Sequence, residues 1–263
     1  MSVLELERVS VRFGGHLAVS DVSLRVEGGR ISGLIGPNGA GKTTTFNAVC
    51  GVVTPSSGRI RLDGRDISRL GTHQRARLGI GRTFQRLEVF ASLTVRENVQ
   101  VGLEIRRSWS RRRGALPQYL AGGGDPSPAE EVDLILDRLE LAPLADTIVG
   151  ALPTGHARLV ELGRALAARP SILLLDEPAS GLDDHETQAF GDLLVTLAQN
   201  GLGILLVEHD VALVMRVCEE LSVLDFGQII ARGTPEEVRS NEAVLAAYLG
   251  TTPDAATSGG GLG

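Results

Sequence analysis

Gly36-Pro37-Asn38-Gly39-Ala40-Gly41-Lys42-Thr43-Thr44 follows an apolar segment, residues 31–35, and opens a segment with a helical pattern, residues 42–50. Its spacing fits G-x-x-x-x-G-K-[ST], in which a strand, a glycine-rich turn and a helix follow one another. In that context the glycines allow backbone N–H groups to surround a polyphosphate, and the helix N-terminus adds a partial positive charge. The stretch therefore predicts a phosphate-binding loop in an α/β fold. The alternative is an ordinary glycine-rich turn before a helix.

Lys42 is the single lysine of the chain, because the 26 basic side chains are 25 arginines and one lysine. A preference for arginine codons accounts for the arginines but not for the exception. An enclosed phosphate slot needs a compact ammonium rather than a broad, planar guanidinium. We therefore expect Lys42 to reach the β and γ phosphates, and the hydroxyl of Thr43 to hold Mg²⁺.

The composition is that of a globular protein and excludes several classes. The 263 residues are 43% hydrophobic but only 3% aromatic, so aliphatic side chains must build the core. A net charge of −6 argues against a general nucleic-acid binder. Cys50 and Cys218 form no ligand cluster and indicate buried thiols in a reducing compartment. The N-terminus has no signal-peptide pattern and no apolar run approaches the length of a membrane span, so we expect a cytoplasmic protein.

Apolar segments alternate with helical patterns along the chain, which is typical of an α/β core with a parallel sheet. Strands are expected at residues 4–12, 22–26, 31–35, 59–62, 172–175 and 203–207, and helices at 42–50 and 184–199. Residues 94–168 are mainly helical in pattern, broken by an arginine-rich segment, 106–113, and by a loop at 122–126. Strands on both sides of this region indicate an inserted helical subdomain. Residues 251–263 have too little apolar surface to order themselves.

Two of these strands are expected to deliver polar side chains to the carboxyl edge of the sheet, where ligands bind in open α/β folds. Asp176 and Glu177 follow the first strand; Asp176 is expected to hold Mg²⁺, and Glu177 to orient and deprotonate an attacking water. His209 closes the second and is a candidate γ-phosphate contact. The plainer alternatives are a helix start for the carboxylates and a structural role for the histidine.

These elements, in this order, resemble the nucleotide-binding subunit of an ABC transporter over residues 3–250. Asp176-Glu177-Pro178 resembles the Walker B segment of that family, and Ser180-Gly181-Leu182-Asp183 resembles the D-loop. Gln85 matches the Q-loop glutamine, His209 the switch histidine and Phe13 the aromatic residue that stacks on adenine. The resemblance implies an α/β P-loop NTPase (RecA-like) core with an antiparallel β subdomain. It further implies one domain over residues 1–250, with the helical subdomain at roughly 90–165.

The resemblance also implies a role for each site residue, in an ATPase whose two subunits enclose two ATP molecules. ATP would contact Phe13, Gly36, Pro37, Asn38, Gly39, Ala40, Gly41, Lys42, Thr43 and Thr44. Hydrolysis would use Lys42, Gln85, Glu177 and His209, and Mg²⁺ would be held by Thr43, Gln85 and Asp176. Thr154, Gly155 and Asp183 would act in trans, on ATP held by the partner subunit.

A narrower resemblance is to the ATP-binding subunits of branched-chain amino acid importers. It is carried by the blocks Phe13-Gly14-Gly15, Gly79-Ile80-Gly81-Arg82-Thr83-Phe84-Gln85, Val89-Phe90, Leu93-Thr94-Val95, Glu97-Asn98-Val99 and Ala247-Tyr248-Leu249-Gly250. It implies two integral-membrane permeases, a substrate-binding protein and a place on the inner face of the cell membrane. Coupling to the permeases would involve Gln85 and residues 86–100. The substrate stays open among branched-chain amino acids, other amino acids, amides and urea.

The signature of the family, usually Leu-Ser-Gly-Gly-Gln, is Leu152-Pro153-Thr154-Gly155-His156 in this chain. Pro153 lacks both the hydroxyl and the N–H that would face the γ-phosphate, and Thr154 replaces only part of that. We therefore expect a heterodimer with a second ATPase subunit, in which this chain has an intact phosphate-binding loop and contributes a weakened signature.

Other interpretations remain at this point. The segment 106–113 is either a solvated loop, a contact with anionic lipid or a membrane subunit, or an RNA contact. A soluble ABC-type ATPase of translation or DNA repair is the main rival, although such proteins usually carry paired ATPase domains or a long coiled coil. A P-loop kinase or metabolic enzyme is the second rival.

Overall fold

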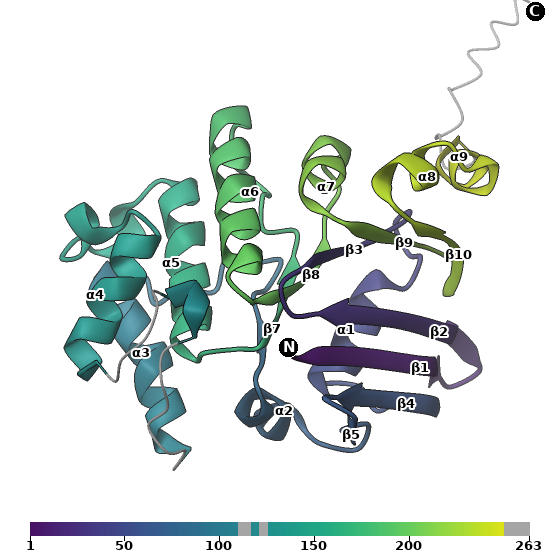
Figure 1. Cartoon of the computed structure of the whole chain (residues 1–263), viewed down its shortest axis with the longest axis horizontal. Helices are drawn as coiled ribbons and strands as arrows, with labels where there is room; N and C mark the ends of the chain where they lie inside the picture. Colours follow the sequence, from purple (N-terminus) through teal and green to yellow (C-terminus); the bar gives the residue numbers. More distant parts are fainter. Residues whose placement is uncertain (110–116, 121–125, 250–263) are drawn as a thin grey trace, which may run out of the picture.

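A central sheet of six strands, in the order β10-β9-β3-β8-β7-β6, organises the computed structural model, which describes residues 1–109, 117–120 and 126–249 (Figure 1). The strands are β3 (Ile31–Ile35), β6 (Ile80–Arg82), β7 (Ile172–Asp176), β8 (Gly203–Val207), β9 (Glu220–Asp225) and β10 (Gln228–Gly233). Neighbouring strands are parallel except in the β9–β10 hairpin. Every residue of β7 and β8 is buried, as expected for strands covered on both faces.

Alternate side chains of the central sheet enter two different cores. Leu173 and Leu206 point into one core, together with helices α6 (Asp184–Gln199) and α7 (Val211–Val217). Leu174 and Val207 point into the other, where Phe46 of α1 (Lys42–Cys50) is fully buried. The period-2 alternation of a strand thus places helices on both faces of the sheet.

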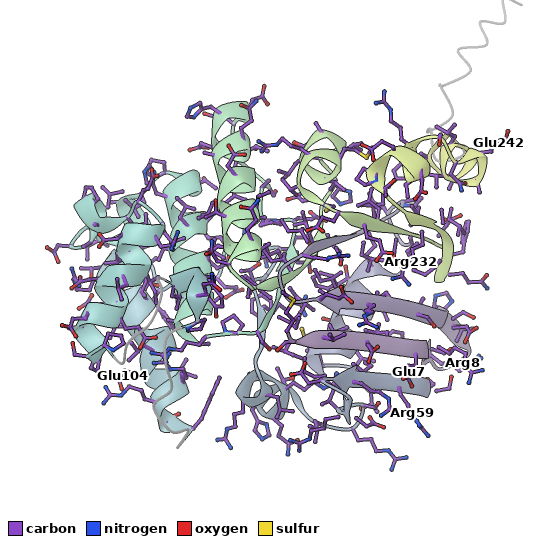
Figure 2. All side chains as sticks on the ribbon, viewed as in Figure 1. Glu7, Arg8, Arg59, Glu104, Arg232 and Glu242 are labelled. Atoms are coloured by element: carbon purple, nitrogen blue, oxygen red, sulfur yellow. The ribbon has the colours of Figure 1, made fainter. Side chains whose placement is uncertain are left out.

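A second, antiparallel sheet covers α1 from the other side. Its strands, in the order β2-β1-β4-β5, are β2 (His16–Glu27), β1 (Val3–Phe13), β4 (Ser57–Leu62) and β5 (Arg65–Asp66). Glu7, Arg8 and Arg59 lie at the end of this sheet that faces away from the helices on the left of the view (Figure 2). The combination of an α/β core with an antiparallel β layer confirms the predicted fold class.

The helical subdomain lies between β6 and β7 in the chain and packs at one end of the molecule (Figure 1). It consists of α3 (Val95–Ser108), η1 (Gln118–Leu120), α4 (Pro128–Arg138), η2 (Ala142–Leu144), η3 (Val149–Ala151) and α5 (Thr154–Ala167). Glu131 of α4 is 2% exposed and binds two arginines, Arg106 of α3 at 2.5 and 2.7 Å and Arg169 at 2.8 and 3.0 Å. This ion cluster ties α3 and α4 to the segment that leads into β7.

The prediction that the helical pattern breaks at the start of the arginine-rich segment 106–113 was wrong. The arginine-rich segment does not break the helical pattern at residue 106, because α3 continues to Ser108 and Arg106 turns inward to Glu131. Arg106 is therefore part of the subdomain rather than of a solvated loop. The rest of that segment from residue 110, most of the loop predicted at 122–126, and the tail 251–263 lie outside the described residues.

The remaining helices are α2 (Thr72–Leu78), α8 (Pro235–Arg239) and α9 (Glu242–Leu249), and the last two lie beside the β9–β10 hairpin (Figure 1). The strand predicted at residues 203–207 is β8, and His209, which was expected to close this strand, lies two residues beyond its end at Val207. In the described part of the chain, no helix combines the length and the apolarity that crossing a bilayer requires.

Candidate nucleotide-binding and catalytic site

The loop between β3 and α1 has a backbone that only glycine adopts readily. Gly36, Gly39 and Gly41 have φ angles of 149°, 80° and 106°. A Cβ atom would lie 1.9 Å from the carbonyl oxygen of Leu224 at Gly36, and 2.7 Å from that of Ala18 at Gly41. The loop therefore wraps closely against its neighbours, and it ends at the N-terminus of α1, which has no acidic residue in its first turn. This cradle of backbone N–H groups fits a polyphosphate.

Lys42 is enclosed by the loop that precedes it. Its side chain is 7% exposed, and Nζ donates hydrogen bonds to the carbonyl oxygens of Gly36 at 2.6 Å and Pro37 at 2.9 Å. Burial lowers the pKa of Lys42, while the nearby carboxylates of Glu177 and Asp176 oppose that shift. Lys42 therefore lies enclosed at the phosphate-binding loop, and its predicted contact with the β and γ phosphates stays a prediction.

A cleft opens over this loop and collects residues that are distant in the sequence. It is lined by Phe13, His16, Ala18, Asn38, Gly39, Ala40, Gly41, Lys42, Thr43, Thr44, Gln85, Glu177 and His209. Phe13 is half-exposed at the end of β1 and pairs with His16 across the β1–β2 turn. Its free aromatic face suits stacking on a nucleobase. His16 was not predicted, and a solvent-exposed turn residue gives no sequence signal for such a position.

Glu177 joins two other predicted catalytic side chains. Gln85 Nε2 donates to Glu177 Oε2 at 3.0 Å, and His209 Nε2 lies 2.6 Å from Glu177 Oε1. The backbone of Glu177 has a φ of 49°, which is strained for a residue other than glycine, and such strain is common at functional sites. The structure thus brings together Gln85, Glu177 and His209, while their predicted catalytic roles stay predictions.

Asp176 occupies a more enclosed position, as the last residue of β7. It is 3% exposed, and its Oδ2 accepts a hydrogen bond from Arg82 Nη2 at 3.1 Å. Burial raises the pKa of Asp176, while Arg82 and Lys42 act in the opposite direction. Thr43, Gln85 and Asp176 supply oxygen atoms, the donors that Mg²⁺ prefers, so the residues present fit that ion.

Several buried side chains hold the site in place and were not predicted. Arg158 of α5 donates to the backbone oxygens of Phe84 at 3.2 Å and Gln85 at 2.9 Å, and pairs with Glu161 at 3.2 Å. Glu208 accepts hydrogen bonds from the backbone of Ala179 at 2.7 Å and of His209 at 3.0 Å. Burial raises the pKa of Glu208. A sequence gives little sign of such side-chain-to-backbone contacts, since the partners lie up to 74 positions apart.

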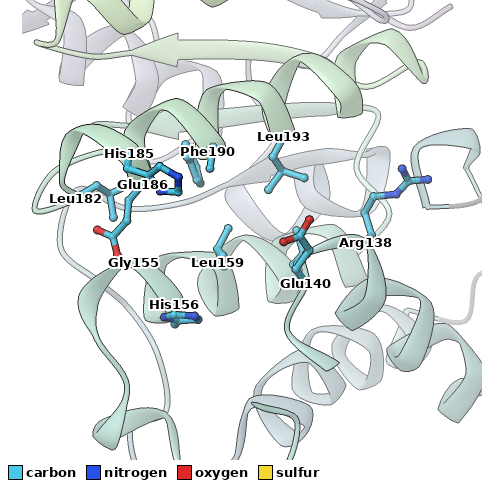
Figure 3. A pocket seen from close by; sticks show the side chains of 12 residues that line it. Arg138, Glu140, Gly155, His156, Leu159, Leu182, His185, Glu186, Phe190 and Leu193 are labelled. Atoms are coloured by element: carbon cyan, nitrogen blue, oxygen red, sulfur yellow. The ribbon is translucent and has the colours of Figure 1, made fainter. Parts of the chain in front are cut away.

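The residues expected to act in trans lie outside the nucleotide cleft. Thr154, Gly155 and Asp183 are absent from the lining of the nucleotide cleft, and Gly155 borders another pocket, between α5 and α6 (Figure 3). Asp183 caps α6 by accepting a hydrogen bond from the backbone N–H of Glu186 at 2.8 Å. The Glu186 carboxylate also packs against Gly155, where a Cβ would be only 2.3 Å away. The structure therefore separates these residues from the chain's own phosphate-binding loop.

The chain combines two features of P-loop ATPases. A glycine-rich loop connects a strand of a parallel sheet to a helix, and a buried strand of the same sheet leads into two adjacent carboxylates. Residues 19–180 match the family model described as ABC transporter, and the chain belongs to this family. Residues 228–253 match a second model, described as branched-chain amino acid ATP-binding cassette transporter.

Individual relatives extend over nearly the whole chain. The chain is 40% identical over 250 residues to the lipopolysaccharide export system ATP-binding protein LptB of Haemophilus influenzae, covering 95% of this chain and 98% of that protein. It is 39% identical over 249 residues to the high-affinity branched-chain amino acid transport ATP-binding protein BraF of Pseudomonas aeruginosa, covering 94% and 98%. Export and import relatives are therefore about equally similar.

Solved structures agree with the fold. The ADP conformation of MJ1267, an ATP-binding cassette of an ABC transporter, is 29% identical with a TM-score of 0.79, covering 95% of this chain and 99% of that one. A nucleotide-free ATP-binding cassette is 28% identical with a TM-score of 0.79, covering 94% and 99%. These matches confirm the predicted fold class and an ATPase coupled to transport.

Proposed function

We propose that this chain energises an importer for branched-chain or related hydrophobic amino acids, bound through two integral-membrane permeases to the inner face of the cell membrane. The observation that carries this proposal is the match of residues 228–253, which include β10, α8 and α9, to the model described as branched-chain amino acid ATP-binding cassette transporter. Lipopolysaccharide export is the second candidate, because the similarity to LptB is as high as that to BraF. A substrate-binding protein completes the proposed import system.

ATP binds in the cleft, with adenine on Phe13 and the phosphates in the loop from Gly36 to Thr44. Lys42 neutralises charge on the β and γ phosphates. Mg²⁺, held by Thr43, Gln85 and Asp176, supplies further electrostatic stabilisation of the phosphates when it is bound. The closely packed glycines at 36 and 41 support this assignment, because larger residues would displace the loop backbone.

Hydrolysis consists of attack by water on the γ-phosphorus, and Glu177 polarises that water as a general base. Gln85 and His209 both contact the Glu177 carboxylate in the structure. When His209 turns to the γ-phosphate and Gln85 to the metal site, both oxygens of Glu177 become available to water. The same movement of Gln85 displaces residues 86–100, which form the proposed coupling surface to the permeases.

The partner subunit is proposed to be a different ATPase. Pro153 stands at the N-cap of α5 and has neither a hydroxyl nor a backbone N–H, so the start of this helix offers fewer donors to a phosphate than the usual signature. Mixing the purified chain with its candidate partner tests this: ATP turnover should rise well above the sum of the separate subunits. Dimerisation and full turnover by this chain alone would rule the heterodimer out.

The transport role is tested by isolating the affinity-tagged chain from membranes of its own organism and identifying what copurifies. The importer assignment predicts two permeases, a second ATPase and, after mild cross-linking, a substrate-binding protein. Recovery of lipopolysaccharide-export components would establish the second candidate. Recovery of ribosomes or repair proteins, with no permease, would contradict both transport assignments and favour a soluble ATPase.

A further inference from the structure

Arg82 stands at the point where three parts of the nucleotide site meet. From β6 its guanidinium donates to Asn47 Oδ1 on α1 at 2.7 Å and to Asp176 Oδ2 at the end of β7 at 3.1 Å. It also stacks against two aromatic rings, with its central carbon 5.9 Å from the ring centre of Phe46 and 5.0 Å from that of Phe84. The side chain is 12% exposed. One cation therefore contacts the helix after the phosphate-binding loop, the metal-site carboxylate and the residue before Gln85.

The geometry of this contact determines how Asp176 is presented. A planar guanidinium fixes the direction of each N–H bond, so the bonds to Asn47 and Asp176 together limit rotation of the carboxylate. Arg82 binds Oδ2 only, which leaves Oδ1 for another partner. Carboxylates that bind metals are commonly oriented by a hydrogen bond of this kind, and loss of that bond weakens metal binding.

Arg82 also connects this carboxylate to the segment that carries Gln85. The backbone N–H of Thr83 donates to Leu174 on β7 at 3.0 Å, and the Phe84 ring covers the guanidinium. Phe84 is itself 46% exposed, so Arg82 contacts a residue that is partly open to solvent. A shift of Phe84 would change the packing on Arg82 and with it the support of Asp176.

We propose, on the basis of the magnesium-dependent ATP hydrolysis proposed above, that Arg82 is a positioning residue for the metal site. It holds Asp176 in the orientation that accepts Mg²⁺ and links that orientation to the position of Gln85. Its role is distinct from that of Lys42, since Arg82 is absent from the lining of the nucleotide cleft.

The test measures binding rather than turnover, in a Glu177→Gln background in which hydrolysis is expected to be slow. A fluorescent ATP analogue is titrated in EDTA, and Mg²⁺ is then titrated at a fixed analogue concentration. Arg82→Gln should raise by about tenfold the Mg²⁺ concentration at which the enhancement of analogue binding is half-maximal. Arg82→Lys should raise it by less, because lysine keeps the charge but not the planar guanidinium with its two directed donors. Affinity in EDTA should change by less than about twofold, because Arg82 does not touch the phosphate cradle.

Arg106→Gln is the matched control, because it removes an arginine of similar burial from a buried carboxylate in the helical subdomain. In this control, the Mg²⁺ concentration for half-maximal enhancement (the Mg²⁺ midpoint) should equal that of the parent, the Glu177→Gln chain with Arg82 intact. A folded Arg82→Gln variant with an unchanged midpoint would overturn the proposal; if Arg82→Gln does not fold, an unchanged midpoint in Arg82→Lys would do so. No enhancement by Mg²⁺ in the parent would instead overturn the magnesium role itself, and this inference with it.

Discussion

At the scale of single residues, the site depends on short polar contacts between side chains from separate strand ends. Glu177, Gln85 and His209 come from three different loops, yet both oxygens of the Glu177 carboxylate have a partner within 3.0 Å. Lys42 is likewise held by two carbonyl oxygens of its own loop. These contacts orient the Glu177 carboxylate and the Lys42 ammonium within the site.

Glu177→Gln should retain ATP binding and lose at least about tenfold in turnover, which corresponds to roughly 1.4 kcal/mol of barrier. The amide keeps the shape of the carboxylate and one acceptor oxygen, but it accepts no proton from water. Steady-state phosphate release and equilibrium nucleotide binding measure the two effects. Turnover equal to wild type would remove Glu177 from the role of general base.

Lys42→Arg should lose most ATP turnover although the charge is unchanged. The larger guanidinium has to enter a space in which Nζ lies 2.6 Å from the Gly36 oxygen, so it would displace the loop. Phosphate release is the measurement. Arg59→Lys, the reverse exchange at an exposed position of β4, is the control and should behave as wild type. Normal turnover in Lys42→Arg would show that position 42 needs only positive charge.

At the scale of elements, the inserted helices depend on buried ion pairs as well as on apolar packing. Burial acts to raise the pKa of Glu131, but the hydrogen bonds from Arg106 and Arg169 outweigh it, so the pKa lies below its usual range. A carboxylate whose folded-state pKa is lowered stabilises the fold above its unfolded-state pKa. That contribution is lost as the pH falls through the folded-state value.

Glu131→Gln should therefore lower the free energy of unfolding by about 3 kcal/mol near neutral pH, because two buried arginines lose their counter-charge. The difference from wild type should shrink below about pH 4.3, the ordinary pKa of a glutamate, as the wild-type carboxyl becomes protonated. Urea unfolding at a series of pH values measures this.

Glu104→Gln is the control for this comparison, because Glu104 forms an exposed pair with Arg107 on the same subdomain (Figure 2). It should change the free energy of unfolding by less than about 1 kcal/mol at every pH. A loss in Glu131→Gln as small as this, or one independent of pH, would contradict the proposed role of the cluster.

The sequence predicted elements best where a glycine marks one end of the segment. Residues 31–35, 42–50 and 203–207 form β3, α1 and β8 as expected. The β9–β10 hairpin was not predicted, because its turn places Phe226, rather than a usual turn residue, at a φ of 41°. Arg82 was also missed as a partner of Asp176. The two are 94 positions apart, and only the parallel pairing of β6 with β7 brings them together.

At the scale of the whole molecule, the nucleotide cleft and the signature residues belong to separate surfaces. The cleft lies over the loop between β3 and α1, whereas Thr154, Gly155 and Asp183 lie at the starts of α5 and α6. A second ATPase subunit would bring its own signature to this cleft, as proposed above. Whole-chain identity is similar for the import and export relatives. The proposal of import over export therefore rests on the local match at residues 228–253.

The most direct test of the central proposal is uptake of labelled leucine into proteoliposomes that contain this chain and its copurified permeases, with the substrate-binding protein outside and ATP enclosed. Wild-type chain should support ATP-dependent uptake. The Glu177→Gln chain should assemble equally well and support at most about a tenth of that rate, following its expected loss of turnover. Leucine uptake at the wild-type rate with Glu177→Gln, or no ATP-dependent uptake with the wild-type complex, would contradict the account.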